Sequence, residues 1–384
     1  MTYIKSRIAT YLSEVPNSVK LSEFPLTKMD LNALEGVQYG IGVFKGDTLP
    51  DIALISKRFE TVNFFRGCKW GCLHCLKNAK APKPGKESVL FEDLKKLASG
   101  FRILSERLGF NVLNGNHYIS IVDDSNPFDL PINGLTRKYD AVDGIEVLFK
   151  NLKIPALVVT SGIDTTNKKS ESFSSKVAKK LNKTVTKNPD MVKKVEISIN
   201  PFLRVNDYTG RMAKTLAIFL DLFKIEKAKI IYRHTAGSYP EYDFNAAKKL
   251  YEEIFKKLQN ITGYSLEGIS ELNPKYVTAF DRSHLIEPSG RGRRFFDYER
   301  NGALQKDLNQ DYMNWENLSE TEKKDFLLDN SLKGIDIDGS VYATIRSCAR
   351  SESTPIELIV PTGIKLNYVN KEKPNPLFSD IVLD

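Results

Sequence analysis

Residues 58–75 read RFETVNFFRGCKWGCLHC, and this stretch carries most of the information about the fold. Its first eight residues are rich in β-branched and aromatic side chains, which is typical of a strand. Only Arg66 and Gly67 separate this strand from Cys68. Ligands of parallel α/β sheets bind beyond the carboxyl ends of the strands, so the junction is predicted to be a functional site.

Three of the four cysteines, Cys68, Cys72 and Cys75, lie within eight residues with the spacing C-x3-C-x2-C. The fourth is Cys348. Three neighbouring thiols cannot all pair with one another, so the cluster indicates a metal site rather than disulfides. An iron–sulfur cube normally takes four thiolates. With three, one iron is left open to another ligand, which favours chemistry over electron storage.

A structural zinc site is the alternative that the cysteines leave open. Zinc ligands usually come in two separated pairs, and the fourth ligand here would be Cys348 or a histidine from elsewhere in the chain. His74 lies between Leu73 and Cys75 and is badly placed to join three thiolates that are already clustered. A zinc-stabilised binding protein is therefore the competing class of function.

Strand-like runs alternate with amphipathic helices from about residue 57 onward. The predicted strands are 58–65, 117–124, 155–161, 194–200, 229–234 and 275–287. The predicted helices are 90–108, 139–151, 171–186, 208–224 and 243–259. Six strands separated by helices imply an α/β fold with an all-parallel sheet. Periodicity alone does not choose between an open doubly wound sheet and part of a barrel.

The sequence predicts three parts. Residues 1–56 form an N-terminal extension with an added strand at 37–44, and 57–290 form the α/β part. Residues 291–384 form a small C-terminal α+β region, with a helical piece at 318–332 followed by hairpin-like segments.

Composition narrows the class of protein. With 41% hydrophobic and 27% charged residues, the chain is an ordinary globular protein able to bury a core. The amino terminus lacks the apolar h-region of a signal peptide, so none is expected. The sequence has no run of about 18 apolar residues, so no membrane span is expected either. Few thiols suit a reducing cytoplasm, which is the expected location. The net charge of +8 permits an anionic partner such as nucleic acid but does not require one. Surplus lysines that only solvate helix faces explain the charge equally well.

The spacing of Cys68, Cys72 and Cys75 directly after a strand resembles the signature of the radical S-adenosylmethionine (radical SAM) superfamily. The resemblance implies a [4Fe–4S] cluster on these cysteines, with SAM chelated to the open iron through its amino and carboxylate groups. It implies reductive cleavage of SAM and abstraction of a hydrogen atom from a substrate. It also implies a partial (β/α)6 TIM-like barrel and a reductant of the flavodoxin or ferredoxin type.

The same resemblance implies SAM-binding residues near the cysteines and after the second strand. His74 is expected to lie near the adenine. Asp124 or Asn126, in the run DDSNP at 123–127, is expected to accept a hydrogen bond from the methionine ammonium. The superfamily usually has a GGEP-like turn here, and this chain has neither its glycines nor its glutamate. The alternative is an ordinary turn, because Asp, Ser, Asn and Pro are all turn residues.

Further SAM contacts are implied after the fourth strand. Ser198 and Asn200 lie at its carboxyl end and match positions that contact the ribose or the carboxylate. Arg211, on the next helix, matches an arginine that binds the methionine carboxylate, for which a guanidinium is well suited. The alternative for Arg211 is a solvated arginine on a helix.

Two segments bear on the substrate. The run LIEPSGRGRR at 285–294 resembles the P-x-GR turn of peptide-modifying members, and GIDIDGSVY at 334–342 resembles the hairpin that opens a SPASM or twitch domain. Only Cys348 follows that hairpin, so no auxiliary cluster is expected. A ribosomally made peptide is the expected substrate, and the alternative is a small molecule or nucleotide bound by the arginines of 291–294. Cys348 is either a buried small side chain or a hydrogen-atom donor.

Overall fold

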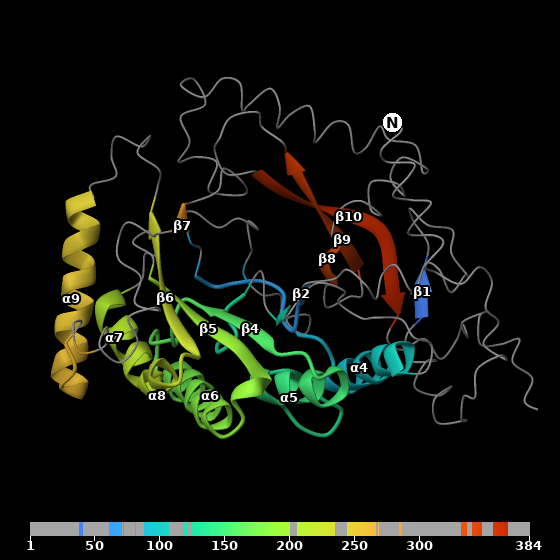
Figure 1. The fold of residues 1–384 in the computed structure, drawn as a ribbon, viewed down its shortest axis with the longest axis horizontal. Helices are drawn as coiled ribbons and strands as arrows, with labels where there is room; N and C mark the ends of the chain where they lie inside the picture. Colours follow the sequence, from blue (N-terminus) through green and yellow to red (C-terminus); the bar gives the residue numbers. More distant parts are fainter. Residues whose placement is uncertain are drawn as a thin grey trace, which may run out of the picture.

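The computed structural model describes residues 38–40, 61–70, 72, 81, 88–106, 118–121, 125–199, 206–234, 244–265, 268, 284–285, 332–335, 340–347 and 356–367. Strands and helices alternate through the central part of the chain, and each of the six predicted strands overlaps an observed one (Figure 1). These strands are β2 (Thr61–Val62), β3 (Ile119–Ser120), β4 (Ala156–Thr160), β5 (Val192–Ile199), β6 (Ala228–His234) and β7 (His284–Leu285). The α/β class is therefore confirmed.

The predicted helices are also present, with one correction. The helices are α4 (Phe91–Glu106), α5 (Ala141–Leu152), α6 (Lys168–Lys187), α7 (Tyr208–Ile218), α8 (Leu220–Lys224) and α9 (Phe244–Thr262), and a 3-10 turn, η2, spans Pro189–Met191. The single helix predicted at 208–224 is wrong, because α7 ends at Ile218 and α8 begins at Leu220. Thr215 Oγ1 donates to the Arg211 carbonyl, a bond known to bend helices, and the Phe219 N–H is shared between two carbonyls.

The parallel strands lie side by side in chain order. The sheet order is β1-β10-β9-β8-β2-β3-β4-β5-β6-β7, and every neighbouring pair from β2 to β7 is parallel. A doubly wound sheet reverses its strand order at a switch point, and the run from β2 to β7 contains no such reversal. The helices α4 to α9 accordingly follow one face of the sheet (Figure 1). This arrangement from β2 to β7 agrees with the barrel alternative, and closure toward a partial barrel stays a prediction.

The core lies between this sheet and its helices. Strand side chains such as Val158, Ile197 and Ile230 are fully buried. Helical side chains such as Leu181, Met212 and Leu258 are buried as well. Burial of one such side chain contributes about 1.5–3 kcal/mol, so this layer fixes where the strand ends lie.

Four strands extend the sheet beyond β2. They are β8 (Leu332–Ile335), which pairs with β2 in parallel, and the antiparallel strands β9 (Ser340–Ser347), β10 (Ile356–Asn367) and β1 (Gln38–Gly40). The predicted hairpin at 334–342 overlaps the antiparallel pair β8 and β9, and the added strand predicted at 37–44 overlaps β1. The predicted helix at 318–332 lies almost wholly outside the described residues. The boundaries between the three predicted parts stay predictions.

The helices in the described part of the chain include no segment with the length and apolar character needed to span a bilayer.

Candidate functional site

The cysteine loop leaves the sheet through buried side chains. Phe64 and Phe65, directly after β2, are fully buried. Gly67 follows with φ +91°, a backbone conformation that glycine adopts without strain and that turns the chain out of the sheet. Cys68 and Cys72 lie on the loop beyond it, half-buried and outside any disulfide. The first two cysteines of the motif are thus presented at the carboxyl end of a parallel strand.

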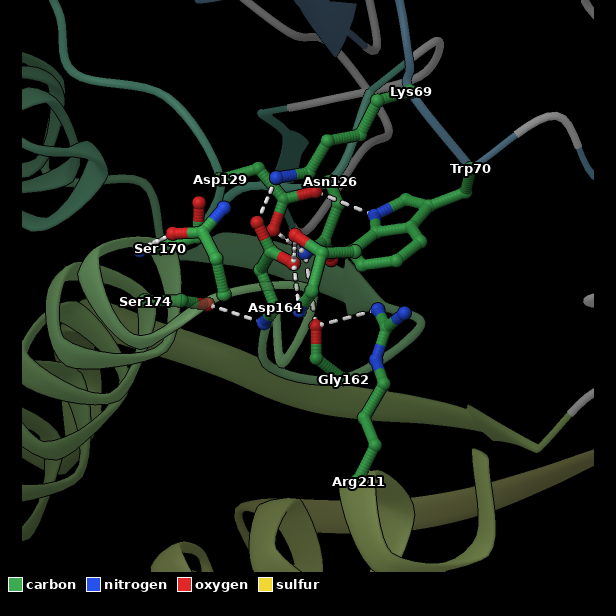
Figure 2. Close-up of polar contacts among 11 residues, drawn as sticks. Lys69, Trp70, Asn126, Asp129, Gly162, Asp164, Ser170, Ser174 and Arg211 are labelled. Atoms are coloured by element: carbon green, nitrogen blue, oxygen red, sulfur yellow. Dashed lines mark hydrogen bonds and ion pairs between the residues drawn. The ribbon is translucent and has the colours of Figure 1, made fainter. Parts of the chain in front are cut away.

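The two residues that follow Cys68 point away from it toward neighbouring units of the fold. Lys69 Nζ donates to Asp164 Oδ2, and Trp70 Nε1 donates to Asp129 Oδ2 at 2.5 Å (Figure 2). Trp70 is buried, whereas the Lys69 side chain keeps 32% of its surface exposed. Burial lowers the pKa of Lys69, while the charge of Asp129 opposes that shift.

Asn126, in the turn after β3, connects two segments of the chain. Its Nδ2 donates to Asp129 Oδ1 at 2.7 Å and to the Gly162 carbonyl at 2.9 Å. Its Oδ1 accepts from Thr160 Oγ1 at 2.7 Å and from the Ser161 N–H at 3.3 Å. A primary amide has two N–H donors and a carbonyl oxygen with two lone pairs, so these four contacts use its hydrogen-bonding capacity in full. Asn126 therefore fixes the turn after β3 to the end of β4.

Gly162, just after β4, has φ +94° and lies against α7. A Cβ at this position would lie 2.8 Å from Thr215 Oγ1 and 3.3 Å from Arg211 Nε. Only glycine fits both the backbone conformation and the space. Its carbonyl accepts from Arg211 Nη2 at 3.0 Å as well as from Asn126. The close approach of this turn is what allows the arginine to reach it.

Arg211 lies in the first turn of α7 and is fully buried. Its guanidinium stacks on Trp70, with Cζ 3.4 Å from the ring centroid (Figure 2). Within the described part of the chain, Nε and Nη1 have no hydrogen-bond partner. Burial lowers the pKa of Arg211, and the charges of Asp129, Tyr208, Cys72 and Cys68 oppose that shift. An arginine remains protonated in proteins, so a buried positive charge lies close to the cysteine loop.

Asp129 balances part of this charge. Burial raises its pKa to about 6, although Arg211 and Lys69 and hydrogen bonds from Asn126 and Trp70 all favour the ionised form. A carboxylate whose pKa lies this far above its ordinary value in a polar cluster is a common sign of a functional site.

The structure brings together four of the residues predicted for the site. Cys68, Cys72, Asn126 and Arg211 belong to one cluster built on the segments after β2, β3 and β4 and on α7. Ser198 is buried near the end of β5. Of the two interpretations of Arg211, the solvated helix arginine is wrong, because the side chain has no exposed surface. Cys75, His74, Asp124, Asn200 and Cys348 lie outside the described residues, and their roles stay predictions.

Sequence reasoning did not identify Lys69, Trp70, Asp129 and Asp164 as parts of the site. A signal was present for all four, because each follows a predicted strand by a few residues, where parallel sheets place their ligands. Asp129 and Asp164 lie among residues that are common in turns, so an ordinary turn was a sufficient explanation for them. Local sequence does not show the contacts between units that bring these four side chains together.

The residues of the loop fit an iron–sulfur cluster in their chemistry. Thiolates are the usual protein ligands of such clusters, and a nearby buried cation with unused N–H groups suits an anionic group bound beside them. Among the residues that the structure describes, no three His, Cys, Asp or Glu side chains form a metal-binding group. Cys75, the third member of the motif, is not among them.

No protein-family model matches the chain, and no curated protein matches it either. Solved structures that are similar to it include the following two. Streptococcus suis SuiB bound to precursor peptide SuiA is 16% identical, with a TM-score of 0.34 over 76% of this chain and 60% of that chain. Streptococcus suis SuiB is 15% identical, with a TM-score of 0.34 over 74% of this chain and 60% of that chain. The chain therefore spans 60% of the length of each, and similarity at this level assigns neither activity nor substrate.

Proposed function

We propose that this chain is a radical SAM enzyme, in which Cys68, Cys72 and Cys75 hold a [4Fe–4S] cluster. Three observations support the proposal: the C-x3-C-x2-C spacing directly after a strand, the parallel strands in chain order, and the buried cation beside the loop. When bound, the cluster and SAM supply one-electron cleavage of a carbon–sulfur bond and abstraction of a hydrogen atom. The partial (β/α)6 barrel over residues 57–290 is part of the same proposal.

The observation that carries the proposal is the state of Arg211. A fully buried guanidinium that leaves Nε and Nη1 without partners in the described chain has a large desolvation cost. A carboxylate offers charge-assisted hydrogen bonds that would offset it. The charges of Cys68 and Cys72 act on this guanidinium, which suits a SAM carboxylate held next to the cluster.

The chain's own residues would orient this carboxylate site in advance. Trp70 stacks on the guanidinium and the Gly162 carbonyl accepts from Nη2, so Arg211 has little rotamer freedom left to lose. Asn126 in turn holds the Gly162 carbonyl and Asp129 in place. The further SAM contacts proposed from the resemblance are His74, Asp124, Asn126, Ser198 and Asn200.

The proposed substrate is a ribosomally made peptide, and the proposed electron donor is of the flavodoxin or ferredoxin type. The P-x-GR turn of residues 288–291 and the hairpin at 334–342 support a peptide. A small molecule or nucleotide is the alternative, with the arginines of 291–294 on its phosphate. Incubation of the reduced protein and SAM with a candidate precursor peptide or a nucleotide, followed by mass spectrometry, separates the two.

Metal analysis tests the central proposal. Anaerobically reconstituted protein should carry about four irons and four sulfides per chain and should release 5′-deoxyadenosine from SAM on reduction. Alanine at Cys68, Cys72 or Cys75 should abolish both, while Cys348→Ala should keep the metal. Stoichiometric zinc without sulfide in native protein would show a zinc-stabilised binding protein instead.

Cys348 bears on the reaction subtype. We propose that it donates the hydrogen atom that closes a redox-neutral reaction such as an epimerisation. The thiyl radical left on its sulfur would regain one electron from the proposed flavodoxin or ferredoxin-type donor and one proton from water. Because a thiol exchanges with water, turnover in D2O should place one solvent deuterium on the product carbon. Cys348→Ala should still cleave SAM and fail to give that product. Normal product from the alanine variant would return Cys348 to the role of a small core side chain.

A further inference from the structure

The cysteine loop is anchored at two consecutive residues between its first two cysteines. Lys69 bonds to Asp164, which lies between β4 and α6, and Trp70 bonds to Asp129, which lies between β3 and α5 (Figure 2). The conformation between Cys68 and Cys72 therefore depends on two other units of the fold as well as on its own backbone.

Both carboxylates are fixed on their far side. Asp164 is fully buried, and its Oδ1 accepts from the Thr166 N–H at 2.9 Å and from Thr166 Oγ1 at 2.7 Å. The Asp164 N–H donates to Ser174 Oγ at 2.9 Å, at the start of α6. Asp129 accepts from Asn126 at 2.7 Å. In each carboxylate, Oδ2 is the oxygen that accepts from the loop, so the pair forms a preset receptor for Lys69 and Trp70.

The loop in turn covers these charges. Asp164 is buried, and a buried carboxylate without a partner is strongly unfavourable. States in which Lys69 leaves Asp164 are therefore disfavoured whether or not a metal is bound. Trp70 also carries the guanidinium of Arg211 on its ring, which joins the anchored loop to the proposed SAM site.

We propose that Asp164 and Asp129 are positioning residues, which dock Lys69 and Trp70 and so hold Cys68 and Cys72 in place before the metal arrives. The identity of the metal rests on the proposed function, but the docking does not. Partners that orient metal ligands typically change metal affinity by about 10–100-fold. We expect a loss of this size in iron loading for Asp164→Asn and Asp129→Asn, whose side chains keep their shape and lose their charge.

Hydrogen–deuterium exchange of the full chain tests the docking directly, in metal-free and in reconstituted protein. In the metal-free state, backbone amides of the peptide covering 66–75 should exchange at least about tenfold faster in Asp164→Asn and Asp129→Asn than in the wild type. Lys69→Gln, which changes only the partly exposed loop side of the pair, should show the same acceleration. Asp143→Asn is the matched control, because Asp143 also accepts from a lysine, Lys180, at 2.7 Å but lies on α5 away from the loop.

The outcomes separate the two proposals. Faster exchange confined to 66–75 with weaker iron loading supports the positioning role. Faster exchange in a chain that binds zinc and no sulfide supports the docking and removes the radical SAM assignment. Unchanged exchange at 66–75 in all three variants overturns the docking, even if iron loading falls. Acceleration spread over the whole chain, matched by Asp143→Asn, would likewise assign the carboxylates to general stability and overturn it.

Discussion

Two regions of this molecule place a lysine against aspartates, and they differ in almost every other respect. At the start of α5, Lys180 bonds to Asp140 at 3.0 Å and to Asp143 at 2.7 Å, and all three side chains remain partly exposed. Beyond the carboxyl ends of the strands, Lys69, Arg211, Asp129 and Asp164 gather around Trp70, with Asp164 buried and Asp129 half-buried.

The polar groups of the first region have hydrogen-bond partners, whereas two buried N–H groups of the second region have none in the described chain. Asp140 accepts from the N–H groups of Val142 and Asp143 and completes a capping box. Burial lowers the pKa of Lys180, but hydrogen bonds to Asp143 and Asp140 raise it overall. In the second region the pKa of Asp129 rises to about 6, and two buried N–H groups of Arg211 stay without partners in the described chain. Such conflicts are common at functional sites, which agrees with the role proposed for the second region.

Asp129→Asn should show the largest contrast in stability. Asp129 holds its proton more tightly in the folded chain than in the unfolded chain, where its pKa is near 3.8. Wild-type stability should therefore fall as pH rises from about 4 to about 7, and a shift from 3.8 to about 6 corresponds to as much as about 3 kcal/mol. Asparagine should remove this component. Urea unfolding of metal-free protein at several pH values measures it, and parallel curves for the two proteins would contradict the buried ionisation.

Arg211→Met should show the largest contrast in ligand binding. A charge-assisted hydrogen bond contributes about 1.5–3 kcal/mol, so SAM affinity of the reconstituted protein should fall by about 10–100-fold. Lys214→Met, on the exposed side of the same helix, where Lys214 pairs with Glu171, should leave SAM affinity unchanged. Calorimetric titration with SAM measures both variants. Equal affinity of Arg211→Met and wild type would mean that another group occupies the unused donors.

The sequence was sufficient for the framework of this comparison. Strand runs such as 58–65 and 155–161 and the periodic helices predicted the parallel sheet, because alternation of these patterns leaves few topologies. The cysteine spacing predicted a site at the end of the first strand, and the structure places Cys68 and Cys72 after β2. Arg211 was predicted as a SAM contact, but its position on a helix fitted a solvated side chain equally well.

The burial of the site could not be predicted from local pattern. Asp129 and Asp164 are turn residues by type, and only the packing of β2, β3 and β4 side by side brings them onto Lys69 and Trp70. Gly162 is similar, because its need for glycine comes from α7, about 50 residues further along the chain. Contacts of this range depend on tertiary packing, which sequence periodicity does not encode. The break between α7 and α8 was missed for the same reason, because the Ile163 N–H donates to Thr215 Oγ1 from another unit.

The smallest effects should come from the satisfied cluster. Asp140→Ala removes the cap of α5 and one partner of Lys180, and should lower stability by about 1 kcal/mol. Asp140→Asn keeps an oxygen for the N–H groups of Val142 and Asp143 and loses only the charge. Since partly exposed ion pairs contribute about 0–1 kcal/mol, it should fall between alanine and the wild type.

Urea unfolding near pH 7 measures these differences, and metal content and SAM affinity of the reconstituted protein should not change in either variant. A loss from Asp140→Asn as large as that from Asp140→Ala would show that the charge, rather than the cap, holds this end of α5. A loss of metal in either variant would break the distinction between the two regions, because it would place Lys180 and its aspartates in communication with the cysteine loop.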